Sequence, residues 1–138
     1  PEQKARALAN ALECGLNIVN FSFTNLTDGD LHFRGLGNLV LPDVILESGV
    51  RAGNGNVFWS GSHLCHDIEV GDCNFFAAGS VIGGSASIGN KNFFGLSSTT
   101  RDHLVVKDNV TIGMGTVVVR DIEKSGVYAG NPARLRER

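Results

Sequence analysis

Residues 70–100 read VGDCNFFAAGSVIGGSASIGNKNFFGLSSTT, and an apolar residue recurs in them with a period of six. Neither an α-helix, with 3.6 residues per turn, nor a flat strand, with a repeat of two, produces this period. It is typical of a solenoid in which three short strands form one coil and each strand sends one side chain inward. The positions that follow this period are called the beat. Thirteen of the fourteen beat positions are apolar, all except Thr100: Val40, Leu46, Ala52, Phe58, Leu64, Val70, Phe76, Ile82, Ile88, Phe94, Thr100, Val106, Ile112 and Val118.

Three sextets make a coil of 18 residues, so positions 18 apart are expected to stack at the spacing of neighbouring strands. Phe58, Phe76 and Phe94 then form one internal column, and fourteen sextets give about five coils. The glycines that directly follow the beat are expected to relieve crowding at the bends and to need positive φ angles. They are Gly53, Gly71, Gly83, Gly89, Gly95 and Gly113.

The period divides the chain into three parts and predicts an all-β fold. Residues 1–37 precede the repeat and are expected to form a helix, capped by Gly15, and a strand. Residues 38–123 form the repeat itself. Residues 124–138 break the period and are expected to cap the open strand edge of the last coil.

Composition excludes several classes of function. The net charge is −2 and no basic stripe is present, so we expect no nucleic-acid partner. No apolar stretch approaches the ~20 residues that a membrane span needs. The three cysteines, Cys14, Cys65 and Cys73, form no C-x-x-C pair, which favours reduced thiols and a cytoplasmic location.

Because side chains fill such a solenoid, a ligand has to bind outside it, in a groove between copies of the chain. Residues 59–67 hold the only tryptophan and two of the four histidines. Leu64 keeps the inward beat, so His66 points outward as a candidate general base, with Asp67 or Glu69 as the carboxylate that orients its ring. Trp59 and His63 are candidate acceptor-binding side chains. A simple solvated histidine is the alternative, and the pair His63-x-x-His66 alone is too small a ligand set for a metal.

A second candidate region consists of stacked glycines with apolar neighbours. Gly95 and Gly113 lie 18 residues apart, followed by Leu96 and Met114. Bare backbone at an outer edge can donate N–H groups to a long, thin ligand. Simple turn formation is the alternative.

The segment Trp59-Ser60-Gly61-Ser62-His63-Leu64-Cys65-His66-Asp67, followed by Val70-Gly71-Asp72, resembles the hexapeptide-repeat acyltransferases. The likeness is strongest to the branch of sialic-acid O-acetyltransferases and nucleotide-amino-sugar N-acetyltransferases of bacterial surface glycans. The final segment Val127-Tyr128-Ala129-Gly130-Asn131-Pro132-Ala133-Arg134, with Asp121-Ile122 before it, is similar to the C-terminal signature of that family.

This resemblance implies a left-handed parallel β-helix that assembles as a homotrimer. It implies acetyl-CoA as the donor in the cleft between protomers, a sugar or nucleotide sugar as acceptor, and His66 as the base. CoA contacts are implied at Phe75, Gly95, Leu96, Gly113 and Met114, and no metal is expected. Many members carry a second histidine where this chain has Phe75, next to the acetyl end of the donor.

Relatives in this branch begin with an acceptor-binding α/β domain, and residues 1–20 resemble its last helix and strand. The resemblance leaves open the acceptor sugar and whether nitrogen or oxygen is acetylated. Two other functions remain as alternatives. A γ-type carbonic anhydrase shares the fold and would need His63, His66 and His103 as zinc ligands. A non-catalytic trimeric scaffold is the other.

Overall fold

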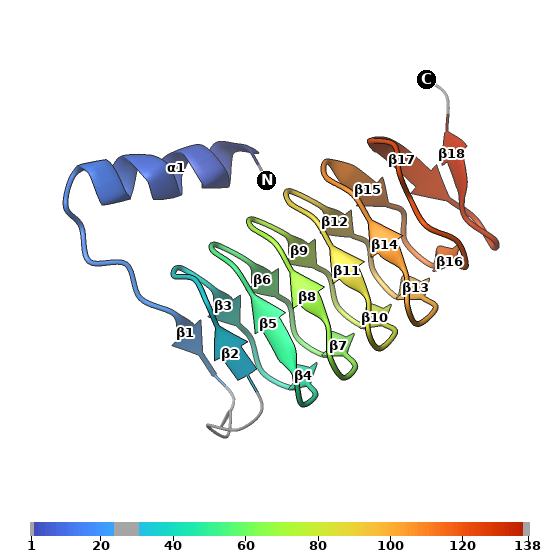
Figure 1. The fold of residues 1–138 in the computed structure, drawn as a ribbon, viewed down its shortest axis with the longest axis horizontal. Coiled ribbons are helices and arrows are strands. Elements are labelled where there is room, and N and C mark those ends of the chain that lie inside the picture. Colours follow the sequence, from blue (N-terminus) through green and yellow to red (C-terminus); the bar gives the residue numbers. More distant parts are fainter. Residues whose placement is uncertain (1, 24–30, 137–138) are drawn as a thin grey trace.

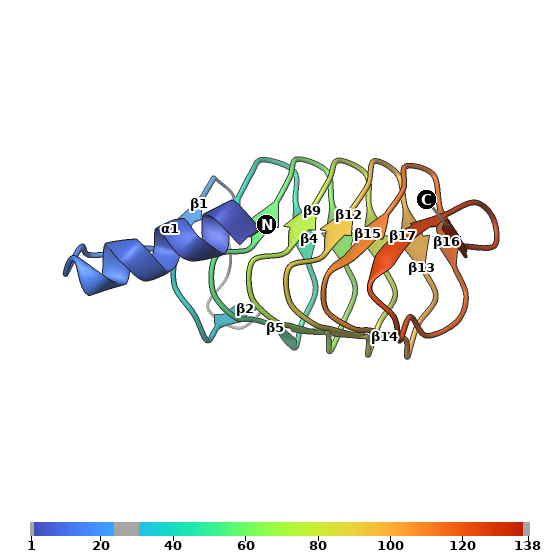
Figure 2. The ribbon, with the colours of Figure 1, turned by 90° about the horizontal axis from the view of Figure 1, so that it is seen from above.

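In a computed structural model, which describes residues 2–23 and 31–136, the chain forms a three-sided parallel β-helix with one α-helix beside it (Figure 1). Each coil contributes one short strand to each of three sheets, in the order sheet A, sheet C, sheet B. The coils wind in the left-handed sense and stack along one axis, from β1 to the C-terminal strands (Figure 2). The predicted fold class is confirmed.

Sheet A has eight strands, and sheets B and C have five each. Sheet A contains β1 (Phe21–Ser22), β3 (Leu39–Val40), β6 (Val57–Phe58), β9 (Phe75–Phe76), β12 (Phe93–Phe94), β15 (Val110–Ile112), β17 (Gly126–Ala129) and β18 (Arg134–Arg136). Sheet B contains β2 (Leu31–Phe33), β5 (Val50–Ala52), β8 (Glu69–Val70), β11 (Ser87–Ile88) and β14 (Val105–Val106). Sheet C contains β4 (Ile45–Leu46), β7 (His63–Leu64), β10 (Val81–Ile82), β13 (Thr99–Thr100) and β16 (Val117–Val118).

From β3 to β16 the strands pair with the 18-residue offset that the sequence predicts. Phe58 pairs with Phe76, and Phe94 pairs with Ile112. The fourteen beat residues are all buried, including Thr100, whose hydroxyl accepts a hydrogen bond of 3.0 Å from the Gly83 N–H. Inside sheet A, the rings of Phe58, Phe76 and Phe94 stack with centroid separations of 5.2 and 4.9 Å. The short strands thus align one apolar column along each of the three sides of the β-helix.

The three kinds of turn are named here after the sheets that they join. The AC corner comprises residues 41–44, 59–62, 77–80, 95–98 and 113–116, and the CB corner comprises residues 47–49, 65–68, 83–86 and 101–104. The BA corner comprises residues 34–38, 53–56, 71–74, 89–92 and 107–109. One residue of each turn has a positive φ between 52° and 80°, at every sixth position from Gly37 to Gly115.

The prediction that the glycines after the beat need positive φ is therefore wrong. The left-handed residue comes two positions later, and it is often not glycine, as at Asp67, Ser97 and His103. The glycines after the beat are needed for close approach between coils. A Cβ on Gly71 would lie 2.7 Å from the carbonyl oxygen of Gly89 in the next coil.

Buried asparagines 18 residues apart form a ladder beneath the BA corner. Asn56 donates its backbone and side-chain N–H groups to Asn38 Oδ1 at 2.8 and 3.0 Å. Asn74 makes the same two bonds to Asn56 Oδ1 at 2.9 and 3.0 Å. Each amide thereby satisfies backbone groups that the turn leaves unpaired inside the protein.

The ends of the β-helix are covered differently. Helix α1 (Glu2–Glu13) is capped by Gly15, which has a φ of 70°, and the Leu16 N–H bonds to the Ala11 carbonyl at 3.0 Å. Leu8 of this helix packs over the BA corner near Gly37 and Gly55. β1 and β2, which lie within residues 1–37, already pair with β3 and β5. At the other end, β17 joins β15 and is covered in turn by the antiparallel β18.

Candidate active site

His66 and Asp67 lie together at the CB corner, directly after β7. The Nδ1–H group of His66 donates a hydrogen bond of 3.0 Å to Asp67 Oδ2, and both side chains are exposed to solvent. This bond fixes the tautomer in which Nε2 carries a lone pair. Asp67 has a φ of 56°, and its own N–H is bonded to the Ser48 carbonyl at 2.9 Å. The pair therefore presents an oriented nitrogen that can accept a proton at the surface.

Gly84 leaves the space in which the His66 ring lies. It stands 18 residues after His66, in the next coil of the same corner, and it is buried. A Cβ on Gly84 would lie 2.6 Å from Nε2 and 2.8 Å from Cε1 of His66. The sequence analysis did not identify this residue. The available signal was the second glycine of Gly83-Gly84 at the 18-residue offset.

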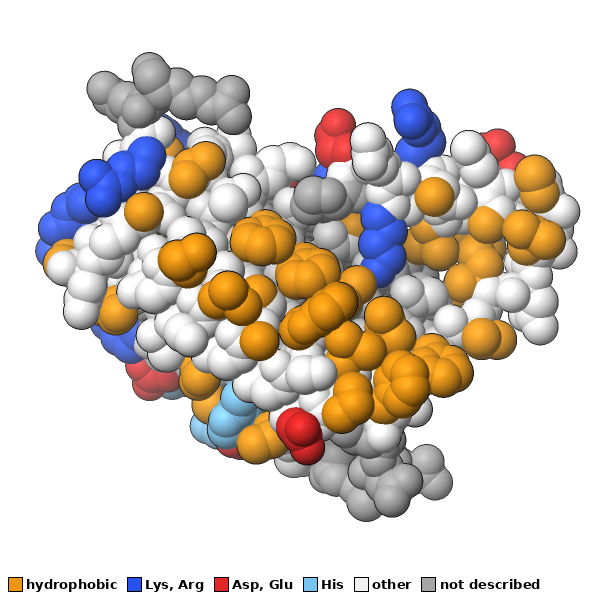
Figure 3. Space-filling model, turned by 180° about the vertical axis from the view of Figure 1, so that it is seen from behind, with side chains coloured by type: hydrophobic (Ala, Val, Ile, Leu, Met, Phe, Trp, Pro, Cys, Tyr) orange, Lys and Arg blue, Asp and Glu red, His pale blue; other side chains and the backbone are white. Residues whose placement is uncertain are grey.

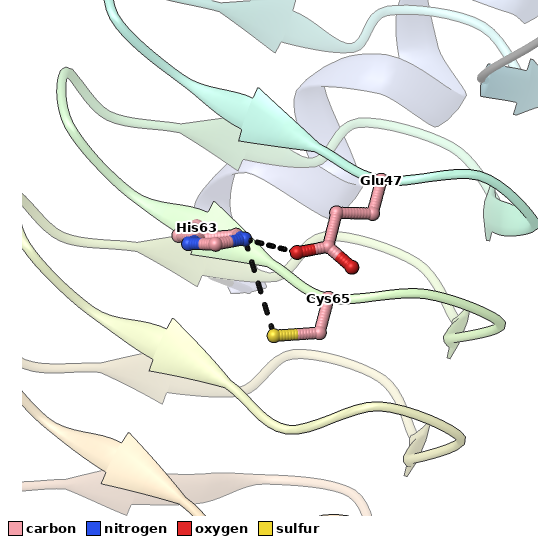
Figure 4. Close-up of side chains that lie close together, drawn as sticks. All are labelled: Glu47, His63 and Cys65. Carbon is pink, nitrogen blue, oxygen red and sulfur yellow. Dashed lines mark hydrogen bonds and ion pairs between the residues drawn. The ribbon is translucent and has the colours of Figure 1, made fainter.

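His63 points outward from β7, on sheet C, and contacts groups of two coils. Its Nε2 lies 2.6 Å from Glu47 Oε1 and 3.9 Å from Cys65 Sγ (Figure 4). Burial and, secondarily, the Glu47 carboxylate raise the pKa of the Cys65 thiol. The sequence pattern points to His63 but not to its carboxylate partner Glu47.

The other predicted residues lie on sheet A and the AC corner. The Trp59 ring stacks on Phe75 with a centroid separation of 5.7 Å, and Phe75 stacks on Phe93 at 5.3 Å. Apolar side chains spread over the face of the molecule turned away in Figure 1 (Figure 3). Trp59 is exposed, and it extends the outer aromatic column beyond β9.

Leu96 and Met114 lie one coil apart on the AC corner, and their side chains are 49% and 75% exposed. The Gly115 N–H bonds to the Leu96 carbonyl at 2.8 Å, which holds the two turns together. A Cβ on Gly95 would lie 2.7 Å from the Met114 nitrogen. The stacked glycines thus bring two exposed apolar side chains next to each other along one edge.

The structure therefore divides the predicted site residues between two corners of the prism. His66 and Asp67 lie at the CB corner, whereas Trp59, Gly95, Leu96, Gly113 and Met114 lie at the AC corner, with sheet C between them. Phe75 lies on the outer side of sheet A, beside the AC corner. A single chain does not bring these two groups together.

The three histidines of the carbonic anhydrase alternative do not converge either. His63, His66 and His103 contact three different carboxylates, Glu47, Asp67 and Asp102. The His103 Nε2 lies 3.8 Å from Asp102 Oδ2, in a turn two coils beyond His66. This arrangement does not favour that alternative. No helix in the described part of the chain is long and apolar enough to cross a membrane.

No protein-family model matches the sequence, and no curated protein sequence matches it significantly. Solved structures do match. The acetyltransferase domain of PglB from Neisseria gonorrhoeae FA1090 is 22% identical, with a TM-score of 0.89 over 98% of this chain and 66% of that chain. PerB from Caulobacter crescentus, solved with CoA and GDP-perosamine, is 22% identical, with a TM-score of 0.91 over 96% of this chain and 64% of that one.

WeeI from Acinetobacter baumannii AYE is 20% identical, with a TM-score of 0.84 over 96% of this chain and 65% of that chain. The chain thus spans 64–66% of the length of these three neighbours. The likeness shows that they share the parallel β-helix fold. It agrees with the resemblance found in the sequence, because the PglB domain is named an acetyltransferase and a further neighbour is a perosamine N-acetyltransferase from Caulobacter crescentus.

Proposed function

We propose that the chain is an acetyltransferase that moves the acetyl group of acetyl-CoA to an amine or hydroxyl group of a nucleotide-linked sugar. The observation that carries the proposal is His66, whose Nδ1–H is held by Asp67 and whose Nε2 lies over Gly84 at an exposed corner. The structural neighbours support the reaction class. One PglB structure contains acetyl-CoA, and PerB contains CoA and GDP-perosamine.

In the proposed reaction, His66 Nε2 removes a proton from the acceptor nitrogen or oxygen as that atom attacks the thioester carbon. A backbone N–H group stabilises the oxyanion of the tetrahedral intermediate. The intermediate then expels the CoA thiolate, which takes the proton from the imidazolium. Asp67 stabilises the imidazolium between the two proton transfers. General-base catalysis contributes on the order of 10²–10⁴ in rate.

The donor is proposed to lie along the AC corner of a neighbouring protomer. Exposed Leu96 and Met114 offer apolar surface there, whereas the N–H groups of Gly95 and Gly113 are already bonded to the Ile112 and Tyr128 carbonyls of the next coil. Because His66 lies at the other corner of its own chain, a closed homotrimer would place one CB corner against one AC corner at each seam. We assign Trp59 and Phe75 to the same cleft.

We place the reaction in the cytoplasm and in surface-polysaccharide biosynthesis. The three cysteines are free thiols, which fits a reducing compartment. Phe75 offers no hydrogen bond to the thioester, so the proposal gives the acetyl carbonyl no side-chain donor at that position.

The proposal is tested by incubating the chain with acetyl-CoA and a panel of nucleotide-amino-sugars while free thiol is measured. A His66→Ala variant is expected to stay folded and to lose about 10²–10⁴ in kcat. Acetyl-CoA at 100 times its Kd should add about 2.7 kcal/mol to the free energy of unfolding. Unchanged turnover in His66→Ala would rule out His66 as the base, and the absence of any thermal shift would favour a scaffold.

A further inference from the structure

We infer that Glu47, His63 and Cys65 form a zinc-binding site on sheet C, separate from the proposed catalytic pair. One ligand atom from each residue lies within 4.8 Å of the other two, and all three residues are half-buried. Figure 4 shows the carboxylate and the sulfur approaching the same ring nitrogen, Nε2 of His63. The inference goes beyond the proposed acetyl transfer and does not rest on it.

The convergence on one nitrogen is what distinguishes this group from an ordinary hydrogen-bonded pair. A single ring nitrogen carries at most one proton, so Nε2 serves as donor to only one of its two neighbours. The Glu47 oxygen lies 2.6 Å and the Cys65 sulfur 3.9 Å from Nε2. A cation between the three atoms would instead contact all of them at once.

The distances are close to those of a tetrahedral zinc site. Bond lengths of about 2.3 Å to sulfur and about 2.1 Å to nitrogen or oxygen place the nitrogen about 3.4 Å from the oxygen and about 3.6 Å from the sulfur. The Glu47–His63 contact must therefore open by about 0.8 Å, and the His63–Cys65 contact must close by about 0.3 Å. Side-chain rotations of the three residues suffice for such shifts.

The backbone that carries the three ligands is rigid. β4 and β7 pair in register, with Ile45 opposite His63 and Leu46 opposite Leu64. The Glu47 N–H bonds to the Leu64 carbonyl at 3.0 Å, and the Cys65 N–H bonds to the Ile82 carbonyl at 3.0 Å. Ligands on paired strands are held more precisely than ligands on loops. The ion would join two successive coils.

The charges and the ligand chemistry favour Zn²⁺. A carboxylate and a thiolate together carry two negative charges, which one divalent cation balances. Within residues 2–23 and 31–136, the ion pairs of Glu47 include no lysine or arginine. One sulfur, one imidazole and one carboxylate are ligands that zinc accepts, and three protein ligands leave a fourth position open. His63 would then be a metal ligand in place of its expected role in binding the acceptor.

The test uses the full chain, treated with a chelator and then titrated with ZnCl₂ or CoCl₂. We expect one zinc per chain, and a cobalt form with a thiolate-to-cobalt charge-transfer band and the visible bands of tetrahedral coordination. Zinc should also protect Cys65 from iodoacetamide in peptide mapping. A chain that retains no zinc above the blank, or cobalt bound without the charge-transfer band, would overturn the inference.

Three variants and two controls localise the ion. Cys65→Ser, His63→Gln and Glu47→Gln should each weaken zinc binding by more than about 100-fold, beyond the 10–100-fold typical of residues that only support a ligand. Glu47→Gln is the sharpest test of the three, because the amide oxygen still accepts the His63 hydrogen bond and only the negative charge is lost. Cys14→Ser and His103→Gln should bind zinc like the unaltered chain. If Glu47→Gln and Cys65→Ser bind zinc with the affinity of the unaltered chain, the metal binds elsewhere.

Discussion

One residue in each turn adopts the left-handed conformation, and glycine occupies only some of these positions. Ser97, with a φ of 52°, and seven other non-glycine residues lie in this region. The left-handed region costs a residue with a Cβ about 1–2 kcal/mol relative to glycine, whereas glycine loses about 0.5–1 kcal/mol of additional backbone entropy on folding. The balance at such a position favours glycine by a fraction of a kcal/mol to about 1 kcal/mol.

We therefore predict that Ser97→Gly raises the free energy of unfolding by about 0.5–1 kcal/mol. Ser87→Gly is the matched control, because Ser87 is also an exposed serine but lies in strand β11 without a positive φ. There the entropy cost acts alone, and the free energy of unfolding should fall by about 0.5–1 kcal/mol. Urea denaturation measures both. If both substitutions changed the free energy of unfolding in the same direction, the left-handed backbone of Ser97 would not explain its effect.

Asp67 is predicted to matter for activity rather than for folding. Asp67→Asn keeps a side chain that tolerates positive φ but loses the charge that stabilises the His66 imidazolium. We expect kcat to fall at least about tenfold, within the range that general-base catalysis supplies. Asp43→Asn makes the same change at another left-handed corner position, which follows a proline instead of a histidine. Equal activity of the two variants would remove Asp67 from the proposed mechanism.

The sequence predicted the direction of individual side chains where the inward beat constrained it. Leu64 fixed the outward direction of its neighbours, and the adjacent pair His66 and Asp67 was identified correctly as lying together. Glu47 and Gly84 were missed because their contacts cross from one coil to the next. The beat gives the stacking of the backbone, but it does not specify which outward side chains of adjacent coils turn toward each other.

At the scale of elements, the buried asparagine ladder joins successive coils alongside the apolar columns. Asn74 Oδ1 accepts the Asn92 backbone N–H at 2.9 Å, and its Nδ2 donates to the Gly89 carbonyl at 2.9 Å. Asn90 is half-buried and has a related role, in which its Oδ1 accepts the Asp72 N–H at 2.7 Å. Water can take the place of the Asn90 amide as a hydrogen-bond partner, but it has no access to the buried amide of Asn74.

Asn74→Ala is therefore predicted to cost about 2–5 kcal/mol, since buried groups left unpaired cost about 1–3 kcal/mol each. Asn90→Ala, the matched control one turn further along the same corner, should cost no more than about 1.5 kcal/mol. The comparison is made by thermal and urea unfolding. Similar losses for the two variants would show that the burial of the ladder does not determine its contribution.

The strands of the repeat and the strand β1 before it were predictable, and β2 was not. The period of six marks β3 to β16 because each of those strands ends on a beat residue. β2 (Leu31–Phe33) lies before the beat begins, and it joins sheet B by pairing with β5 rather than by continuing the pattern. The asparagine ladder did leave a signal, asparagine at every eighteenth residue from Asn20 to Asn92, which the analysis of apolar positions did not use.

For the whole molecule, the decisive property is that the candidate catalytic pair and the candidate donor site lie on different corners. Sheet C separates His66 from Leu96 and Met114 within one chain. The core of the prism is filled by buried side chains, so an internal pocket cannot join them. Under the proposed function, a working site requires the CB corner of one protomer and the AC corner of another.

This arrangement predicts complementation between two inactive variants. One variant is His66→Ala, and the other is the double variant Leu96→Glu with Met114→Glu, two exposed positions where new charge should repel the donor without unfolding the chain. Each alone is expected to be inactive as a homotrimer. When equal amounts are unfolded together and refolded, roughly a quarter of the seams combine an intact His66 with an intact AC corner. Roughly a quarter of the activity of the unaltered chain should therefore return.

The control refolds each variant alone, and a triple variant that carries all three substitutions is mixed with either single-corner variant. Neither control creates an intact seam, so neither should regain activity, although light scattering should report the same trimer mass in all samples. Mixed trimers that stay inactive would show that both corners act within one chain or that one of them has no role. A monomer in every sample would remove the seam, and with it the proposed placement of the donor against His66.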